Sequence, residues 1–279
     1  MDDSQNTQKT QPKQPMEVHG VNFVTRLQQL DGDFYHLKRW HLWQQDTLVT
    51  EVFAMGWKLF IIDPKACPVN LMTDQLLRPA GNELFALFLP AKEVVCWQIS
   101  ASYIYWEAYT SNTPLRVNLP GAVMFPWDRT SAFSTAAEVA EHLIQLKYYT
   151  PVSRRAETCS VAQRTKDYLD AHYTNDLSMR TIANTLNVPY STMTHYFRRS
   201  FGLSPSEYRQ HLRITAAGGL IVSHEKSATE SCFATGHGDY SAFKQGFKKV
   251  FGVSPRHFSK VADSTDTCHP PWRKEMETW

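Results

Sequence analysis

Residues 197–208 read FRRSFGLSPSEY, and fifty residues later residues 247–258 read FKKVFGVSPRHF. Nine of the twelve positions follow one pattern, F-[KR]-[KR]-x-F-G-[LV]-S-P-x-x-[YF]. In each copy two phenylalanines stand four residues apart, which places them on the same face of a helix as core anchors. The glycine that follows can adopt the left-handed backbone conformation that ends such a helix. Each copy therefore predicts a helix that stops at the glycine.

The Ser-Pro pair after each glycine predicts that a new helix begins at once. Ser204 is the expected N-cap, Pro205 occupies the first turn, and Glu207 completes a capping box with the serine. The second copy keeps Ser254 and Pro255 but has a histidine where the glutamate would stand, so only half of this cap is present. The repeat thus encodes two helix-stop-helix joints.

The residues before the first joint predict a helix-turn-helix unit. In residues 177–186 the apolar side chains recur at helical spacing and include Ile182 and Ala183, and Asn187 then tolerates a left-handed turn. The next segment, residues 189–199, has one apolar face and one face that is short-polar and basic. A small residue where two helices cross, a polar turn and a polar outer face are typical of a DNA-reading unit.

One such unit alone could equally be an ordinary helical hairpin with a solvated face. The repeat favours DNA binding, because a helix predicted at residues 208–222 can place two reading helices about 34 Å apart along one duplex. Charge points the same way. Residues 151–260 hold 15 Lys and Arg against 8 Asp and Glu, whereas residues 1–150 hold 12 against 15. The near-neutral total of +2 therefore hides a segment typical of proteins that bind polyphosphate.

These residues resemble the C-terminal DNA-binding domain of AraC/XylS-type transcription regulators. The resemblance covers about residues 160–260 and rests on the doubled motif, on residues 182–183 with 186–188, and on Gly236 followed by Phe243. It implies an all-α, bilobed domain with two helix-turn-helix units, whose two recognition helices enter successive segments of the major groove. We expect this domain at residues 159–260, after a linker at 151–158 and before a C-terminal tail at 261–279.

The resemblance also assigns roles to individual side chains by their position in the motif. Groups that can bond base edges fall at Ser191, Thr192, Thr194, His195, Tyr240, Ser241, Lys244 and Gln245. Basic residues at the ends of the two recognition helices, expected to bind phosphates, are Arg198, Arg199, Lys248 and Lys249.

The second unit departs from the family pattern. Ser231-Cys232 stands where an isoleucine-alanine pair is usual, and His237 stands where a phenylalanine is usual. A polar group in place of an apolar anchor weakens a core by about 1–3 kcal/mol. Gly218-Gly219 in the connecting helix costs roughly 1 kcal/mol per residue relative to alanine. We therefore expect the second unit to be less stable than the first and to contact the DNA backbone more than the bases.

Residues from about 20 to 130 have a different character. Short apolar runs, such as residues 59–62 and 84–89, alternate with turn signals that contain proline, glycine or asparagine. This spacing is typical of a β-sandwich or barrel. The resemblance implies a cupin-like domain here that binds an effector or dimerises. We expect an α+β chain with this domain at residues 16–150, behind a disordered N-terminus at 1–15.

The N-terminal domain is expected to end in a helix. Residues 134–148 carry an apolar stripe at helical spacing, and Ser134 or Thr135 can cap it. Such a helix either joins two copies of the chain or packs on the barrel as a strut, and the sequence leaves both open.

We predict no catalytic residues, no metal site and no cofactor, and hence no enzyme. The five cysteines include no C-x-x-C pair, and the histidines before residue 150 include no H-x-H. No nucleophile elbow or phosphate loop occurs. Two alternatives stay open: a DNA-repair alkyl acceptor fused to a DNA-binding domain, which needs cysteines clustered on zinc, and a cupin-like enzyme with a DNA-binding tail.

The sequence therefore predicts a sequence-specific DNA-binding transcription regulator, more commonly an activator in this family, controlled by a ligand or partner at the N-terminal domain. Expected partners are double-stranded promoter DNA and RNA polymerase, while a small-molecule effector and a homodimer are left open. No run of about 18–20 apolar residues occurs, and residues 1–14 are polar. We expect a cytoplasmic protein that does not insert into a membrane.

Overall fold

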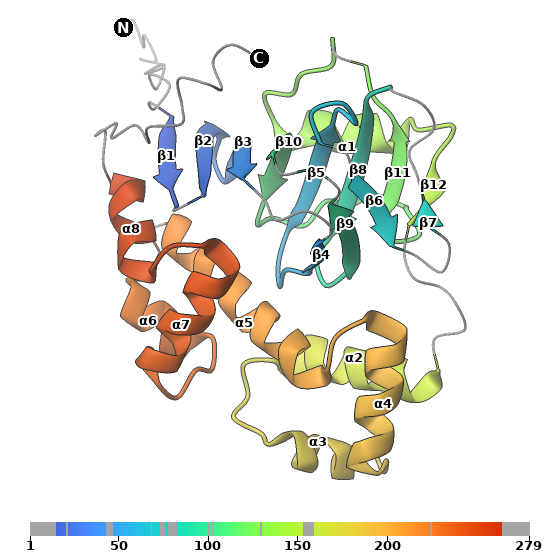
Figure 1. The fold of residues 1–279 in the computed structure, drawn as a ribbon, viewed down its shortest axis with the longest axis vertical. Helices are drawn as coiled ribbons and strands as arrows, with labels where there is room; N and C mark the ends of the chain where they lie inside the picture. The colour runs from blue at the N-terminus through green and yellow to red at the C-terminus, as the bar shows by residue number, and fades with distance from the viewer. Residues whose placement is uncertain are drawn as a thin grey trace, which may run out of the picture.

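The computed structural model describes residues 15–20, 22–42, 47–67, 69–72, 76–77, 83–99, 101, 103–128, 130–152, 159–223 and 225–263. A β-rich part precedes a helical part (Figure 1), which confirms the predicted α+β fold class. The predicted disordered N-terminus (except residue 15), most of the linker, and the tail from residue 264 on lie outside the described residues. None of the described helices is both long enough and apolar enough to cross a membrane.

The larger of two antiparallel sheets has eight strands in the order β1-β2-β3-β10-β5-β8-β11-β12. Their bounds are Met16–His19 (β1), Phe23–Asp31 (β2), Phe34–Leu42 (β3), Tyr103–Ser111 (β10), Trp57–Ile62 (β5), Phe85–Pro90 (β8), Val123–Pro126 (β11) and Thr150–Pro151 (β12). The smaller sheet has the order β4-β9-β6-β7. Its strands are Thr47–Glu51 (β4), Val95–Ile99 (β9), Val69–Met72 (β6) and Leu76–Leu77 (β7).

The two sheets share a buried core, so residues 16–152 form a β-sandwich. Strands β5 and β8 contribute Phe60, Ile62 and Leu87 to this core, and β9 contributes Trp97 from the other sheet. The intervening residues of β5 and β8 point to the opposite face, where Leu59 and its neighbours are buried in a second cluster. Because both faces of these strands are covered, their sequence is apolar at every position except Lys58 rather than alternating.

Helix α1 (Ala136–Ile144) covers that second face. Thr135 accepts a hydrogen bond from the backbone N–H of Glu138 and is the N-cap, as the sequence allows. Val139 and Leu143 are fully buried against the sheet, whereas Ile144 at the end of the helix is 65% exposed. The helix therefore acts as a strut on the sandwich, and a role in dimerisation stays a prediction.

In the described part of residues 159–263 seven helices follow: Ser160–His172 (α2), Met179–Thr185 (α3), Tyr190–Phe201 (α4), Pro205–Val222 (α5), Ala228–Ala234 (α6), Tyr240–Phe251 (α7) and Pro255–Asp263 (α8). Both stops predicted from the repeat are present, since Gly202 and Gly252 have φ of 77° and 78°. The full capping box of Ser204 and Glu207 opens α5. At α8 the hydroxyl of Ser254 accepts the N–H of His257, which is the predicted half of a box.

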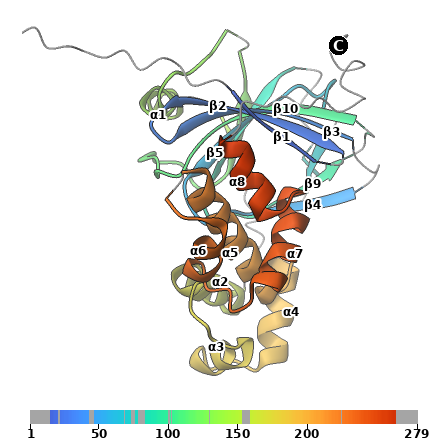
Figure 2. The same cartoon turned by 90° about the vertical axis from the view of Figure 1, so that its left-hand side faces the viewer.

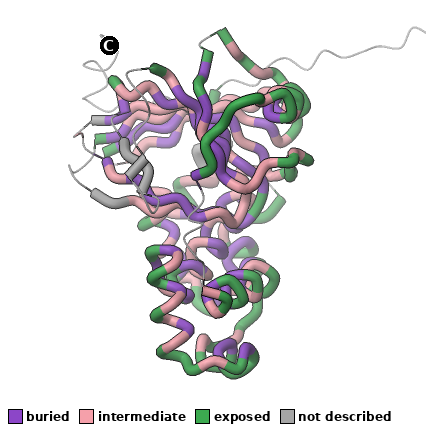
Figure 3. The backbone as a smooth tube through the Cα atoms, turned by 90° about the vertical axis from the view of Figure 1, so that its right-hand side faces the viewer, coloured by how far each residue is buried: buried purple, intermediate pink, exposed green. Residues whose placement is uncertain are grey.

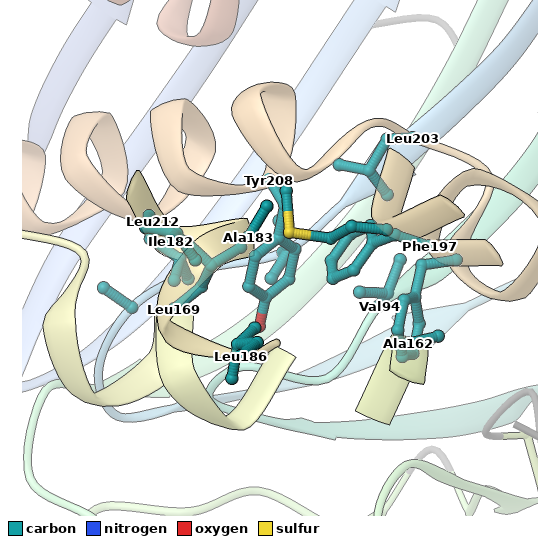
Figure 4. Close-up of a cluster of buried hydrophobic side chains, with 14 of the residues drawn as sticks. Val94, Ala162, Leu169, Ile182, Ala183, Leu186, Phe197, Leu203, Tyr208 and Leu212 are labelled. Atoms are coloured by element: carbon teal, nitrogen blue, oxygen red, sulfur yellow. The ribbon is translucent and has the colours of Figure 1, made fainter. Parts of the chain in front are cut away.

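The helices form two lobes joined by α5. The first lobe surrounds Phe197 and Tyr208, and its core includes Val94, which comes from the β-sandwich (Figure 4). The second lobe surrounds Phe243 and Phe247 of α7. Along the helical part buried and exposed residues alternate in the manner of amphipathic helices (Figure 3).

The β-sandwich contacts both lobes (Figure 2). Ala54 and Val94 of the sandwich lie in the core of the first lobe, and the backbone N–H of Ala54 donates to Thr215 of the connecting helix α5 at 3.1 Å. On the second lobe, Val18 and Phe23 of the sheet form a small buried cluster with Val253. The β-sandwich therefore packs against the lobes on both sides of the connecting helix α5.

Candidate DNA interface

The recognition surface of the first lobe is the outer face of α4. Met193, Phe197 and Phe201 are buried on the inner face. Ser191 and His195 on the other side are exposed, and Thr192 is half-buried. Asn187, with φ of 53°, makes the left-handed turn that sets α4 across α3. Three of the four predicted base-reading residues of this lobe thus lie on an accessible face.

Thr194 differs from its neighbours. Its hydroxyl oxygen is buried and has no hydrogen-bond partner among the residues that the structure describes. The residue as a whole is half-buried, as Thr192 is, and base reading by Thr194 stays a prediction.

The second lobe repeats this arrangement on α7. The carboxylate of Asp239 caps the helix by accepting the N–H of Ala242, and Phe243 and Phe247 hold the inner face. Ser241, Lys244 and Gln245 are exposed on the outer face, at the positions that the sequence predicts.

Tyr240 is half-buried at the start of α7. Its ring packs on Phe243 with the ring centroids 5.7 Å apart. Its contribution to the outer face is therefore limited to part of the side chain.

Four basic residues were predicted to bind phosphates at the ends of these helices. Arg198, Arg199 and Lys248 are exposed in the last turns of α4 and α7. Lys249 is exposed too, but it lines a cavity between the helices and the β-sandwich. Arg198 and Lys249 both lie near Glu207 of α5, with the guanidinium of Arg198 3.9 Å from its carboxylate, and phosphate binding by all four residues stays a prediction.

Part of the positive charge in this region serves the fold. Arg164 donates to the backbone carbonyl of Leu186 at 2.6 Å, and Arg209 donates to the carbonyl of Leu177. Arg213 holds the carbonyls of Tyr173 and Asn175 at 2.5 and 2.8 Å. Burial lowers the pKa of Arg209 and of Arg213. The excess of basic residues counted from the sequence therefore overstates the charge available to DNA.

Arg180 is an exposed basic residue that the sequence argument did not select. It lies near the start of α3, and its guanidinium carbon is 5.8 Å from the ring centroid of Tyr190 at the start of α4. Its position one helix before the recognition helix suits a phosphate contact. The sequence feature that could have identified Arg180 is its position on the polar side of the helix predicted at residues 177–186.

The polar residues of the second lobe are accommodated unequally. Ser231 is fully buried, and its hydroxyl has no hydrogen-bond partner within the described part of the chain. His237 lies 3.2 Å from the hydroxyl of Thr235 and packs edge-on against Phe243. Burial, with help from the charge of Arg213, lowers the pKa of His237 to about 4, so this ring is neutral at physiological pH.

Comparison with known proteins decides what this arrangement is. Residues 182–260 match a protein family described as a helix-turn-helix domain. The HTH-type transcriptional activator RhaS of Enterobacter sp. (strain 638) is 26% identical over 98 residues. The Msm operon regulatory protein of Streptococcus mutans is 30% identical over 105 residues. Residues 182–260 form an AraC-type helix-turn-helix domain. The resemblance drawn from the sequence is thus confirmed for this AraC-type domain.

The similarity to these relatives is partial. It covers 35% of this chain and of RhaS, and 38% of this chain and of the Msm operon regulatory protein. Among solved structures, the C-terminal domain of AraT from Geobacillus stearothermophilus is 24% identical, with a TM-score of 0.37, and covers 42% of this chain and 99% of its own. ToxT from Vibrio cholerae is 11% identical, with a TM-score of 0.49, and covers 88% and 99%.

Proposed function

We propose that this protein is a transcription regulator that binds double-stranded promoter DNA in a sequence-specific manner. The observation that carries the proposal is the pair of exposed polar faces on α4 and α7, each on its own lobe and joined by α5. A helix of this kind fits the major groove of B-DNA, and two of them can bind successive turns.

The side chains divide by chemistry. His195, Lys244 and Gln245 carry groups that can bond base edges and so give sequence preference. Arg198 and Arg199 carry charges that bind phosphates and set position without reading sequence. Lys248 plays the same part in the second lobe.

Regulation is assigned to the β-sandwich, because it contacts both lobes of the DNA-binding part. A ligand or partner protein there would change transcription by altering these contacts. We favour activation, in line with the name of the RhaS relative, and expect contact with RNA polymerase in the cytoplasm. A homodimer fits this role. The relatives reported above are regulators, and we infer no catalysis, cofactor or membrane insertion.

The decisive experiment is selection of bound sequences from random double-stranded DNA by the full-length chain. We expect enrichment of two short motifs separated by about one helical turn. The His195→Ala variant should relax the preference at one position of the site, whereas Arg116→Ala on the β-sandwich should leave it intact. A pool that shows no enriched sequence would contradict the proposal.

A further inference from the structure

The two copies of the repeat differ at one charged position. Residues 204–207 read SPSE, whereas residues 254–257 read SPRH. Each segment starts the helix that follows a recognition helix, namely α5 after α4 and α8 after α7. The first lobe therefore carries a carboxylate, that of Glu207, at the position where the second lobe carries the imidazole of His257.

The carboxylate of Glu207 lies beside a residue that we expect to bind phosphate. It is 3.9 Å from the guanidinium of Arg198 in the last turn of α4, and the two side chains are 59% and 64% exposed. Lys249 in the last turn of α7 lies near the same carboxylate. One negative charge is thus close to the basic ends of both recognition helices.

The start of α5 restrains this carboxylate. It accepts hydrogen bonds from the backbone N–H and the hydroxyl of Ser204 at 2.8 and 2.7 Å. These hydrogen bonds, with the charges of Arg198 and Lys249, lower the pKa of Glu207, so the group is ionised at physiological pH. Because the capping box holds the side chain, the negative charge stays next to Arg198 when DNA approaches.

The distance determines how this charge acts on DNA. Charges closer together than about 8–10 Å are incompletely screened at physiological salt. A phosphate bound by Arg198 would lie within that distance of Glu207, because the guanidinium is itself 3.9 Å from the carboxylate. An exposed ion pair is weak, so a phosphate can displace the carboxylate from Arg198. The repulsion between the phosphate and Glu207 nevertheless remains.

We propose that Glu207 limits the attraction of this protein for DNA of any sequence, because its carboxylate competes with phosphates for Arg198 and repels them. This inference rests on the proposed function. Phosphate contacts contribute equally to all duplexes, whereas sequence preference comes from base contacts. Glu207 therefore weakens binding to non-specific DNA and to the selected site alike, and it leaves the preference between them unchanged.

The first test removes the charge. In Glu207→Gln the amide can still complete the capping box with Ser204. The affinity of the full-length chain for a selected and for a scrambled duplex should rise by about threefold to tenfold, equally for both. The dependence of log Kd on log salt should steepen by up to about 0.9, which is the share of one phosphate contact. Fluorescence anisotropy at several salt concentrations measures both quantities.

Glu138→Gln on the β-sandwich is the matched control. The carboxylate of Glu138 also lies in the first turn of a helix, α1, where it accepts the backbone N–H of Ser134 at 2.7 Å. The variant loses the same charge from a similar helix start and should change the affinity for either duplex by less than about twofold. An equal gain in Glu138→Gln and Glu207→Gln would assign the effect to net charge and overturn the proposal.

The second test transfers the charge to the other copy. The hydroxyl of Ser254 already accepts the backbone N–H of His257 at 3.2 Å, so a glutamate at this position can complete the capping box of α8. In the repeat, position 257 has the same spacing from Lys248 as Glu207 has from Arg198. His257→Glu should therefore lower the affinity for both duplexes by about threefold to tenfold, and it provides the test if Glu207→Gln does not fold.

The outcomes separate this inference from the proposed function. A gain for both duplexes in Glu207→Gln supports the inference. A loss of affinity in Glu207→Gln would overturn it, since Glu207 would then hold Arg198 in its binding position, and so would a gain for the selected duplex alone. Binding that neither Glu207→Gln nor His257→Glu alters would overturn this inference alone. Failure of the wild-type chain to bind any duplex would overturn the proposed function as well.

Discussion

The hydroxyl group of Tyr208 in α5 lies 3.1 Å from the backbone carbonyl of Lys92 in the turn between β8 and β9. The same hydroxyl bonds the carboxylate of Asp170 in α2, and the ammonium group of Lys92 donates to the backbone carbonyl of Asp170 at 2.9 Å. Lys92 adopts a left-handed backbone conformation, with φ of 67°, that costs a non-glycine residue about 1–3 kcal/mol. These contacts bind the β-sandwich to the first lobe.

Removing the Tyr208 hydroxyl should loosen this junction. In Tyr208→Phe the free energy of unfolding should fall by about 1–2 kcal/mol, because the half-buried carboxylate of Asp170 loses one partner and keeps Lys166. Urea unfolding followed by tryptophan fluorescence measures the change. Tyr196→Phe, a half-buried tyrosine of α4, is the matched control and should change stability by less than about 0.5 kcal/mol. Equal stability of the two variants would show that the Tyr208 hydroxyl contributes nothing to the junction.

Arg198 and Arg199 should act on DNA affinity without regard to sequence. In the double alanine variant, log Kd should depend less steeply on log salt by about two, since each phosphate contact contributes about 0.9 to the slope. Fluorescence anisotropy with a selected and a scrambled duplex, at several salt concentrations, measures both slopes. Arg116→Ala on the β-sandwich is the single-charge control. A variant that loses affinity for the selected duplex alone would assign base reading to these arginines.

The buried serine of the second lobe should be a source of instability. Ser231→Ala removes a hydroxyl that is buried without a partner and should raise the free energy of unfolding by about 1 kcal/mol. Ser227→Ala, four residues earlier, removes the N-cap of α6 and should lower it by about 0.5–2 kcal/mol. Both changes delete a serine hydroxyl, but the expected changes in the free energy of unfolding have opposite signs. Thermal unfolding of both variants measures these changes. A loss of stability in Ser231→Ala would mean that its hydroxyl is satisfied in solution.

His237 should make stability depend on pH. Burial depresses the pKa of His237 in the folded chain to about 4, below its ordinary value of 6.5. The unfolded chain therefore binds more protons between pH 4 and pH 6.5, and stability falls as pH is lowered through that window. His237→Phe should flatten this fall, because it removes the titrating group.

The effect of pH is read from urea unfolding at several pH values. His257→Gln, an exposed histidine of α8, serves as control and should keep the wild-type profile. His41 contributes in the same direction, since burial, with the charge of Arg39, lowers its pKa to about 3. A wild-type profile in His237→Phe would place the pH dependence elsewhere.

Local signals in the sequence predicted the helical part well. The glycine stops, the capping box and the apolar faces of α4 and α7 depend on residues within one or two helical turns of each other. The burial of the Thr194 hydroxyl and the position of Lys249 at the cavity were not predictable in this way, because both depend on the segments that pack around each helix.

Contacts between segments that are distant in sequence account for the features that the sequence did not predict. Thr25 and Arg39 face each other only because of the register of β2 and β3, which no short pattern encodes. Gly218 and Gly219 were interpreted as a cost to α5. The structure gives a reason for Gly218, since a Cβ there would lie 2.4 Å from the ring of Phe251, whereas a Cβ on Gly219 would make only a tight contact, 3.2 Å from the side chain of Asn112 in the β-sandwich. The connecting helix lacks side chains at these two positions, where Phe251 and Asn112 pack against its backbone.

Helix α5 is 18 residues long and uninterrupted, about 27 Å from end to end. Under the proposed function α4 and α7 bind the same promoter, and because the core of each lobe includes residues of α5, the length of this helix limits the distance between them. The two half-sites are then expected on the same side of the duplex. Inserting about five base pairs between them, half a turn of the duplex, should rotate one half-site away from the protein and prevent binding of both at once.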